Sequence, residues 1–163
     1  EMDPVDFPPE TVVALAHQLG DTDSKFDAFI GPLESIVAQG RQVLVFTFSR
    51  ATLAYLEQRL AERFRVGVLH GGLKPRDRPE IMARFRAKDF EVMLARRGAS
   101  EGLDFEFCSA VVNYDLPWNP MEVEQRIGRI DRFGQSEEKV VILNFHTPGT
   151  IETDIIERVH ERI

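Results

Sequence analysis

The segment that most constrains the fold is 42–48, QVLVFTF, a nearly unbroken run of apolar, β-branched and aromatic residues. Such a run is typical of a β-strand that is buried on both faces. Strands of that kind occur mainly in parallel sheets whose two faces are covered by helices. The segment therefore predicts an α/β protein with this strand inside the sheet.

The rest of the chain alternates between strand-like and helix-like segments. Asp23 or Ser24 would be the N-cap of the helix at 23–39, and Pro32 should kink or split that helix. The alternation predicts a doubly wound, mainly parallel sheet flanked by helices. Further strands are predicted at 65–69, 91–95, 110–114 and 139–146, and helices at 11–19, 49–63, 75–87, from Asn119 onward and at 150–163.

Length and composition allow one globular domain with its own core, since 43% of the 163 residues are hydrophobic. No apolar run approaches the length that spans a membrane, and we see no secretory leader. The single cysteine, Cys108, excludes an internal disulfide and a multi-cysteine zinc site, and we predict no metal site in this chain. Because the chain begins with Glu1, we expect a piece of a longer protein, with 1–22 as a lead-in and 23–163 as the domain.

Charge is unevenly distributed along the chain. The net charge of −7 by itself argues against a nucleic-acid-binding protein. Residues 59–97, however, hold eleven lysines and arginines against five acidic residues. A basic zone of this kind can face a polyanion, or it can be the solvated outer side of two helices. Charge alone leaves both interpretations open.

Residues 124–135, EQRIGRIDRFGQ, place three arginines on a short predicted helix and its exit. Arg129 and Arg132 are three positions apart, so both should project from one side, with Arg126 on the same stripe. Guanidinium groups without a local counter-charge suit phosphate oxygens, which they bind through paired hydrogen bonds. The alternative is a solvated face that pairs with neighbouring carboxylates.

Small, polar and cationic residues follow the predicted strands, where function gathers in sheets of this type. A Gly-Gly pair after the second strand lets the backbone approach a ligand closely, although it is also a common turn signal. All of these loops lie at one edge of the predicted sheet. The loops comprise residues 47–50, 70–73, 96–104 and 115–120.

Three segments carry a family resemblance: Gly102-Leu103-Asp104, NYDLPWNP at 113–120 and QRIGRIDRFGQ at 125–135. Together they resemble motifs V and VI of superfamily-two helicases and translocases, and 43–60 is similar to motif IV. The Trp-Asn-Pro box and the Arg-Phe-Gly-Gln ending resemble the Swi/Snf-type branch, and within it the bacterial RapA-like branch. The resemblance runs from about residue 20 to the end. It implies a helicase C-terminal domain, which is the second RecA-like lobe of a two-lobed ATPase.

The resemblance also implies ATP with Mg as the cofactor, bound between the lobes. The family's phosphate loop and its Asp-Glu metal-binding box do not occur in this sequence and belong to the first lobe. We therefore expect the Mg ligands there, and we expect the isolated chain to be inactive. The implied catalytic residues are Arg129 and Arg132 as arginine fingers, with Gln125 beside them. Gly102 and Asp104 would link the nucleotide site to the nucleic-acid track.

On the nucleic-acid side the resemblance implies contacts with phosphate rather than with bases. Such contacts tolerate any sequence and depend steeply on salt. Trp118 would lie near the DNA strand, or it would be a core or interlobe aromatic. Arg96 stands where the family usually has Ser or Thr, which leaves its own contact with the polymer open. The implied contact residues are Thr47, Ser49, His70, Gly71, Arg97, Ser100 and Trp118.

The expected partners are the first RecA-like lobe of the same polypeptide, duplex DNA, and RNA polymerase or another DNA-bound protein. No membrane partner is expected, and the expected location is the cytoplasm, in association with the nucleoid. Two other functions compete with a DNA motor. One is an RNA helicase lobe of the same superfamily, and the other is a protein-interaction module without catalysis.

Overall fold

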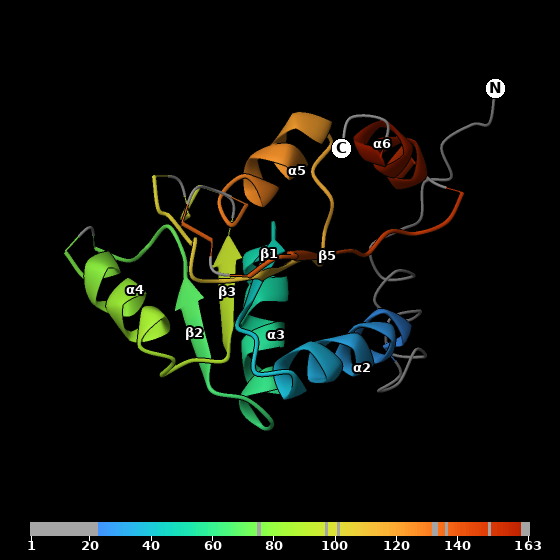
Figure 1. Cartoon of the computed structure of the whole chain (residues 1–163). Helices are drawn as coiled ribbons and strands as arrows, with labels where there is room; N and C mark the ends of the chain where they lie inside the picture. Colours follow the sequence, from blue (N-terminus) through green and yellow to red (C-terminus); the bar gives the residue numbers. More distant parts are fainter. Residues whose placement is uncertain are drawn as a thin grey trace.

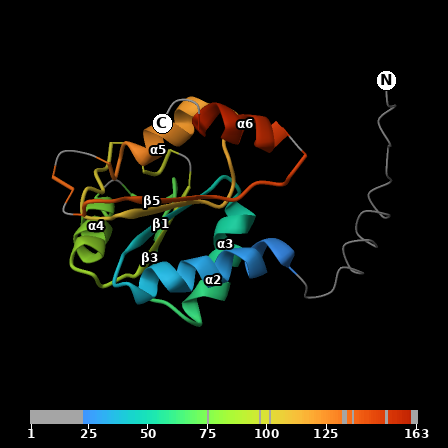
Figure 2. The same ribbon diagram turned by 45° about the vertical axis from the view of Figure 1, so that its right-hand side comes forward.

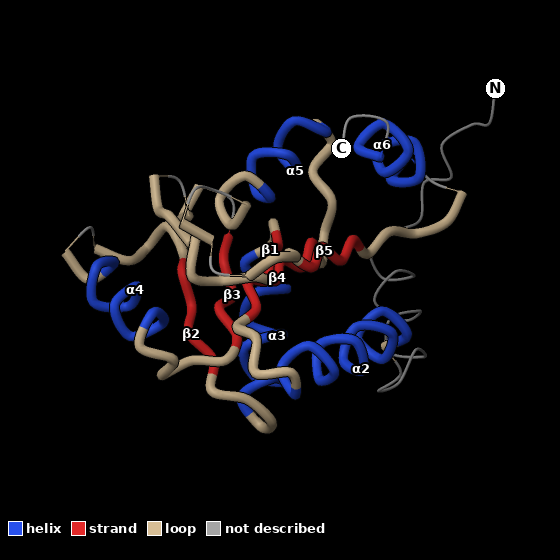
Figure 3. Tube along the Cα trace, in the orientation of Figure 1, coloured by secondary structure: helices blue, strands red, loops and turns tan. Residues whose placement is uncertain are grey.

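A computed structural model of the chain describes residues 23–160, apart from 75, 97, 101, 132, 133, 136 and 150. Within these residues, five strands form one sheet in the order β2-β3-β1-β4-β5 (Figure 3). Every neighbouring pair is parallel. The predicted doubly wound α/β fold is confirmed. The strands are β1 (Val43–Thr47), β2 (Val66–Leu69), β3 (Val92–Arg96), β4 (Ala110–Asn113) and β5 (Val141–Asn144).

Helices cover both faces of the sheet (Figures 1 and 2). One face packs against α2 (Ser24–Ala38) and α3 (Arg50–Ala61), and the other against α4 (Arg78–Arg86) and α5 (Pro120–Ile127), with α6 (Ile151–His160) beside α5. This two-sided cover is what a buried parallel sheet requires.

Strand β1 contributes to the core on both sides. All five of its residues are buried. Val43 and Val45 belong to the core under α2 and α3, whereas Leu44 and Phe46 belong to the core under α4. The alternation follows from the two-residue period of a strand, and it confirms the burial on both faces that the sequence predicted.

The helix starts coincide with strong local signals. Asp23 is the N-cap of α2 and accepts a hydrogen bond from Phe26 N at 2.9 Å. Ser49 caps α3, and Asn119 caps α5 by accepting from Met121 N at 3.1 Å. Side-chain oxygens at these positions satisfy amide groups that have no partner inside the helix.

Two sequence-based details differ from the structure. Pro32 does not split its helix, because α2 continues from Ser24 to Ala38. Pro32 and Ala28 are both exposed, so the carbonyl that loses its helical partner can face water. Four strands are also shorter by one to four residues than predicted, whereas β3 has the predicted length and starts one residue later. Helix α4 starts at Arg78, with Pro79 in its first turn.

Some predictions fall on residues that the structure does not describe. These include the lead-in 1–22 with its predicted helix at 11–19, the start of the fourth predicted helix at Pro75, and the last residues 161–163. Within the described part of the chain, no helix has the length and apolar character that crossing a membrane requires.

We predict a pH-dependent loss of stability for Asp23→Ala. Burial raises the pKa of Asp23, but hydrogen bonds from Phe26 N and the Tyr55 hydroxyl outweigh it and hold the pKa below 3.8. The charged cap therefore stabilises the fold above pH 3.8, and this contribution is lost as the pH falls through the lower folded-state pKa. In urea unfolding at pH 7 the substitution should cost about 1 kcal/mol, and the cost should shrink below pH 3.8.

The control for this experiment is Asp27→Asn, an exposed carboxylate in the same first helical turn. It should change the free energy of unfolding by no more than about 0.5 kcal/mol. A cost for Asp23→Ala that stayed the same from pH 7 to pH 2.5 would contradict the prediction.

Candidate functional site

The carboxyl ends of the strands lie at one edge of the sheet, because all five strands run in the same direction. In Figure 1 the arrows of β2 and β3 point toward the side where α5 lies. Two of the cavities that open at this edge contain predicted site residues. One lies between α5 and the loop after β3, and the other lies between α3 and the loop after β2. Loops at this edge are where ligands bind in open α/β sheets.

The first cavity has a volume of about 280 Å³ and a mainly polar lining. Its walls offer two guanidinium groups, two amides and one hydroxyl, against one carboxylate. The lining residues are Phe46, Gly98, Ser100, Asn119, Glu122, Gln125, Arg126 and Arg129. A donor set of this kind suits an anion with several oxygens.

Arg129 is held in the turn that follows α5. Its amide donates to the Arg126 carbonyl at 3.2 Å, and its own carbonyl accepts from Phe105 N at 3.1 Å. Its Nη1 donates to the Leu103 carbonyl at 3.4 Å. The turn is therefore joined to the loop that follows β3. Among the described residues Arg129 has no carboxylate partner, so its charge is available at the cavity.

Arg126 does not share an outward stripe with Arg129, and that prediction was wrong. Arg126 is only 6% exposed and points inward, over the rings of Phe46 and Phe48, with centroid distances of 4.8 and 5.3 Å. Its Nη1 donates to Asn113 Oδ1 at 2.6 Å. Because α5 ends at Ile127, the three-residue helical spacing does not carry on to Arg129.

The structure describes three of the other predicted residues of this site but not Arg132. Gln125 is exposed and lines the cavity. Gly102 has a φ of +74°, a conformation that favours glycine, and Asp104, two residues later, is exposed. Arg132 lies outside the described residues, so its relation to Arg129 stays a prediction.

The second cavity has a volume of about 450 Å³ and contains His70, Gly71 and Gly72 from the loop after β2. Gly72 N donates to His70 Nδ1 at 3.1 Å, which fixes the ring against the turn. The remaining lining residues are Arg50, Leu53, Ala54, Glu57, Val68 and Arg96.

Arg50 and Arg96 are the residues that the sequence analysis did not assign to a site. Arg96 Nε donates to the Phe48 carbonyl at 3.0 Å, which joins the ends of β3 and β1. Neither arginine has an ion-pair partner among the described residues. The position of Arg50 directly after the N-cap Ser49 was a signal for it, since a helix N-terminus favours anions.

The remaining predicted nucleic-acid residues divide between different environments. Thr47 is fully buried and donates to Asp115, and Ser49 is exposed at the start of α3. Ser100 is buried and lines the first cavity rather than the second. Trp118 is 78% exposed, which excludes the core alternative for its ring. Arg97 lies outside the described residues.

The arginines near the opposite edge of the sheet differ from those at the cavities. Arg63 pairs with Glu34 at 2.6 Å, Arg65 with Glu91 at 3.6 Å and Arg41 with Glu137 at 3.6 Å. Within the described part of the chain, positive charge is thus neutralised at the amino ends of the strands, whereas Arg50, Arg96 and Arg129 have no carboxylate partners. In the described ranges no group of His, Cys, Asp or Glu could hold a metal ion.

Comparison with known proteins identifies the family of this chain. Residues 24–134 match the family model described as the helicase conserved C-terminal domain. The chain is 42% identical over 123 residues to the "uncharacterized ATP-dependent helicase YqhH" of Bacillus subtilis, covering 75% of this chain and 22% of the relative. It is 37% identical over 130 residues to the RNA polymerase-associated protein RapA of Yersinia pestis, covering 77% of this chain and 13% of the relative.

Two solved structures share the fold. The C-terminal part of the Fun30 ATPase domain aligns with a TM-score of 0.76 and 26% identity, over 83% of this chain and 45% of that one. The C-terminal domain of the DEAD-box protein Dbp5 aligns with a TM-score of 0.68 and 28% identity, over 85% and 77%. The expected RecA-like lobe and the resemblance to the RapA-like, Swi/Snf-type branch are confirmed.

We predict that Gly72→Ala displaces the ring of His70, whereas Gly71→Ala does not. A Cβ at position 72 would lie 3.1 Å from His70 Nδ1, but one at position 71 would meet nothing within 4 Å. The imidazole ¹⁵N resonances of His70 should therefore change in the first variant and stay as in wild type in the second. If the His70 resonances of both variants matched those of wild type, the Gly72 contact would not hold the ring.

Proposed function

This chain belongs to the family of helicase conserved C-terminal domains, and we propose that it is the second motor lobe of a nucleic-acid-dependent ATPase of the Swi/Snf type. The supporting observation is the pair of cavities at one sheet edge, each with an arginine that has no carboxylate partner among the described residues. One cavity would face the nucleotide and the other the polymer. The full-length protein would couple ATP hydrolysis to movement along duplex DNA.

The first cavity fits a phosphate group better than a whole nucleotide. At about 280 Å³ it is at the lower limit of small-molecule sites, which are roughly 300–1,000 Å³. Its donors are guanidinium, amide and hydroxyl groups, which suit phosphate oxygens. We therefore infer that ATP is held mainly by the first lobe, which would also hold Mg, and that this lobe contacts its phosphate end.

In this proposal the predicted residues of the nucleotide site have separate roles. Arg129 and Arg132 would donate to the γ-phosphate as arginine fingers and stabilise charge that develops there during hydrolysis. Gln125 would position groups beside them. The loop with Gly102 and Asp104 would orient the fingers, since the Leu103 carbonyl already accepts from Arg129.

The second cavity supports contact with a phosphate backbone. Arg50 and Arg96 supply charge, and the exposed Ser49 and Gly71 leave room for a polymer to approach. We assign His70, Arg97 and Trp118 to the same track. Ser100 would act from the neighbouring cavity, and the buried Thr47 would act on the polymer only through Asp115.

Duplex DNA is the polymer we propose, together with RNA polymerase or another DNA-bound protein as the partner. RapA, with 37% identity, is described as RNA polymerase-associated. The first lobe of the same polypeptide would be the other partner, because the chain spans only 22% and 13% of the relatives named above. A motor of this kind would work in the cytoplasm, at the nucleoid.

We predict that Arg129→Ala and Arg132→Ala each lower DNA-stimulated ATP hydrolysis by the full-length protein about 10³-fold, as removal of an arginine finger does. Steady-state turnover would be measured without polymer and with duplex DNA, single-stranded DNA or RNA. The control is Arg76→Ala, which removes a charge whose side chain is 76% exposed and should leave turnover unchanged.

The polymer that stimulates ATP hydrolysis distinguishes the candidate functions. ATP turnover that duplex DNA stimulates in wild type, but not in Arg129→Ala or Arg132→Ala, supports the proposed motor. Stimulation by RNA alone supports an RNA helicase lobe instead. A wild-type protein that never hydrolyses ATP would leave an interaction module and contradict the proposal.

A second prediction concerns salt. If Arg50 and Arg96 each contact one phosphate of duplex DNA, Arg50→Ala and Arg96→Ala should each reduce the slope of log K against log salt by about 0.9. Fluorescence anisotropy of the full-length protein with labelled duplex at several salt concentrations measures that slope. Arg63→Ala, at the opposite end of α3, is the control and should keep the wild-type slope. An unchanged slope in all three variants would place the track elsewhere.

A further inference from the structure

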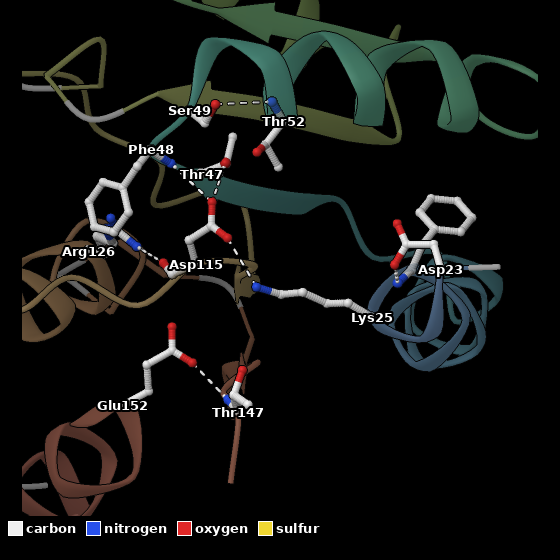
Figure 4. A network of polar contacts seen from close by, with 11 residues as sticks. Asp23, Lys25, Thr47, Phe48, Ser49, Thr52, Asp115, Arg126, Thr147 and Glu152 are labelled. Carbon is white, nitrogen blue, oxygen red and sulfur yellow. Dashed lines mark hydrogen bonds and ion pairs between the residues drawn. The ribbon is translucent and has the colours of Figure 1, made fainter. Parts of the chain in front are cut away.

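Asp115, two residues after the end of β4, joins three other parts of the fold (Figure 4). Its Oδ1 pairs with Lys25 Nζ of α2 at 3.1 Å. Its Oδ2 accepts from Thr47 Oγ1 at 2.5 Å and from Phe48 N at 3.3 Å, both at the end of β1. One carboxylate therefore fixes the end of the central strand to the loop that leads into α5.

The same residue reaches α5 through its backbone. The Asp115 carbonyl accepts from Arg126 Nη1 at 3.3 Å (Figure 4). That guanidinium also lies over the rings of Phe46 and Phe48, which precede and follow Thr47. Asp115 and Arg126 thus hold the end of β1 from two sides, and a partly buried network with this many hydrogen bonds has few alternative arrangements.

The two ends of this network touch the two cavities. At one end, the Phe48 carbonyl accepts from Arg96, which lines the second cavity. At the other end, Arg126 lines the first cavity, and its carbonyl accepts from the amide of Arg129. Described hydrogen bonds and ring contacts therefore lead from one cavity to the other without a break.

We propose that Asp115 is a positioning residue that couples the two cavities, so that occupancy of the polymer cavity changes the affinity of the nucleotide cavity. The inference rests on the proposed function. A polymer that displaces the segment Thr47–Ser49 also displaces the Asp115 carboxylate, which is hydrogen-bonded to that segment. The hydrogen bond from Arg126 to the Asp115 carbonyl then transmits the displacement to Arg126 and to the turn with Arg129. Coupling of this kind is reciprocal, since each ligand must change the affinity of the other by the same factor.

The chemistry of the position explains why a carboxylate is needed. Three donors converge on its two oxygens, from Lys25, Thr47 and the Phe48 amide. An asparagine of the same shape has one acceptor oxygen, and its NH₂ group would face a donor on one side. Asp115→Asn therefore keeps the volume of the side chain but loses at least one arm of the network.

The test measures coupling in the full-length protein. The dissociation constant of labelled duplex DNA is determined with and without a non-hydrolysable ATP analogue, and the ratio of the two values is the coupling factor. We expect a wild-type factor of about 5 or more. Asp115→Asn should bring the coupling factor to within about twofold of one. The affinity for DNA alone and the affinity for the ATP analogue alone should each change less than about threefold. Thr47→Val, which removes one of the two donors to Oδ2 and keeps the Phe48 amide, should lower the factor as well.

The matched control is Asp27→Asn, an exposed carboxylate on α2 that undergoes the same change of charge; it should keep the wild-type factor. A wild-type factor in Asp115→Asn would overturn the inference. The inference would also be overturned if Asp115→Asn and Thr47→Val weakened the binding of DNA and of the ATP analogue equally and left the coupling factor unchanged. Asp115 would then only support the fold. A wild-type protein without ATP hydrolysis would contradict the proposed function itself, which separates the two failures.

Discussion

Burial of β1 on both faces is the constraint on which the rest of the structure depends. A strand with five buried residues at the centre of a parallel sheet needs helices above and below it, and its neighbours must return through crossovers. All carboxyl ends then meet at one edge. Residues far apart in the sequence, such as Phe48, Arg96 and Asp115, come into contact there because the sheet brings their strand ends together.

The elements and the position of the candidate site at one sheet edge could be predicted because local signals determine them. An apolar β-branched run predicts a buried strand, and Asp23, Ser49 and Asn119 mark helix starts through their side-chain oxygens. Placing the loop residues at one edge needed only the rule that parallel strands share a direction. The family resemblance added roles for Arg129 and Gln125, and the structure places both residues at one cavity.

Other features depended on tertiary contacts that spacing does not contain. Helical spacing shows which residues share a side, but not where a helix ends or which side faces the sheet. Since α5 ends at Ile127, Arg126 and Arg129 have different environments. Thr47 was predicted as a surface contact but ends a buried central strand, so its hydroxyl is enclosed with Asp115. Arg50 and Arg96 face a cavity that exists only when α3 packs beside β2 and β3.

The distribution of ion pairs explains how an acidic chain can present cationic cavities. Net charge adds all residues together, whereas an anion responds to the charges within about a Debye length, roughly 8–10 Å in physiological salt. Near the amino ends of the strands, Arg63 and Arg65 are neutralised by carboxylates. At the carboxyl edge, Arg96 and Arg129 donate to backbone carbonyls instead. A carbonyl orients a guanidinium without cancelling its charge, so these side chains are held in place and can still attract phosphate.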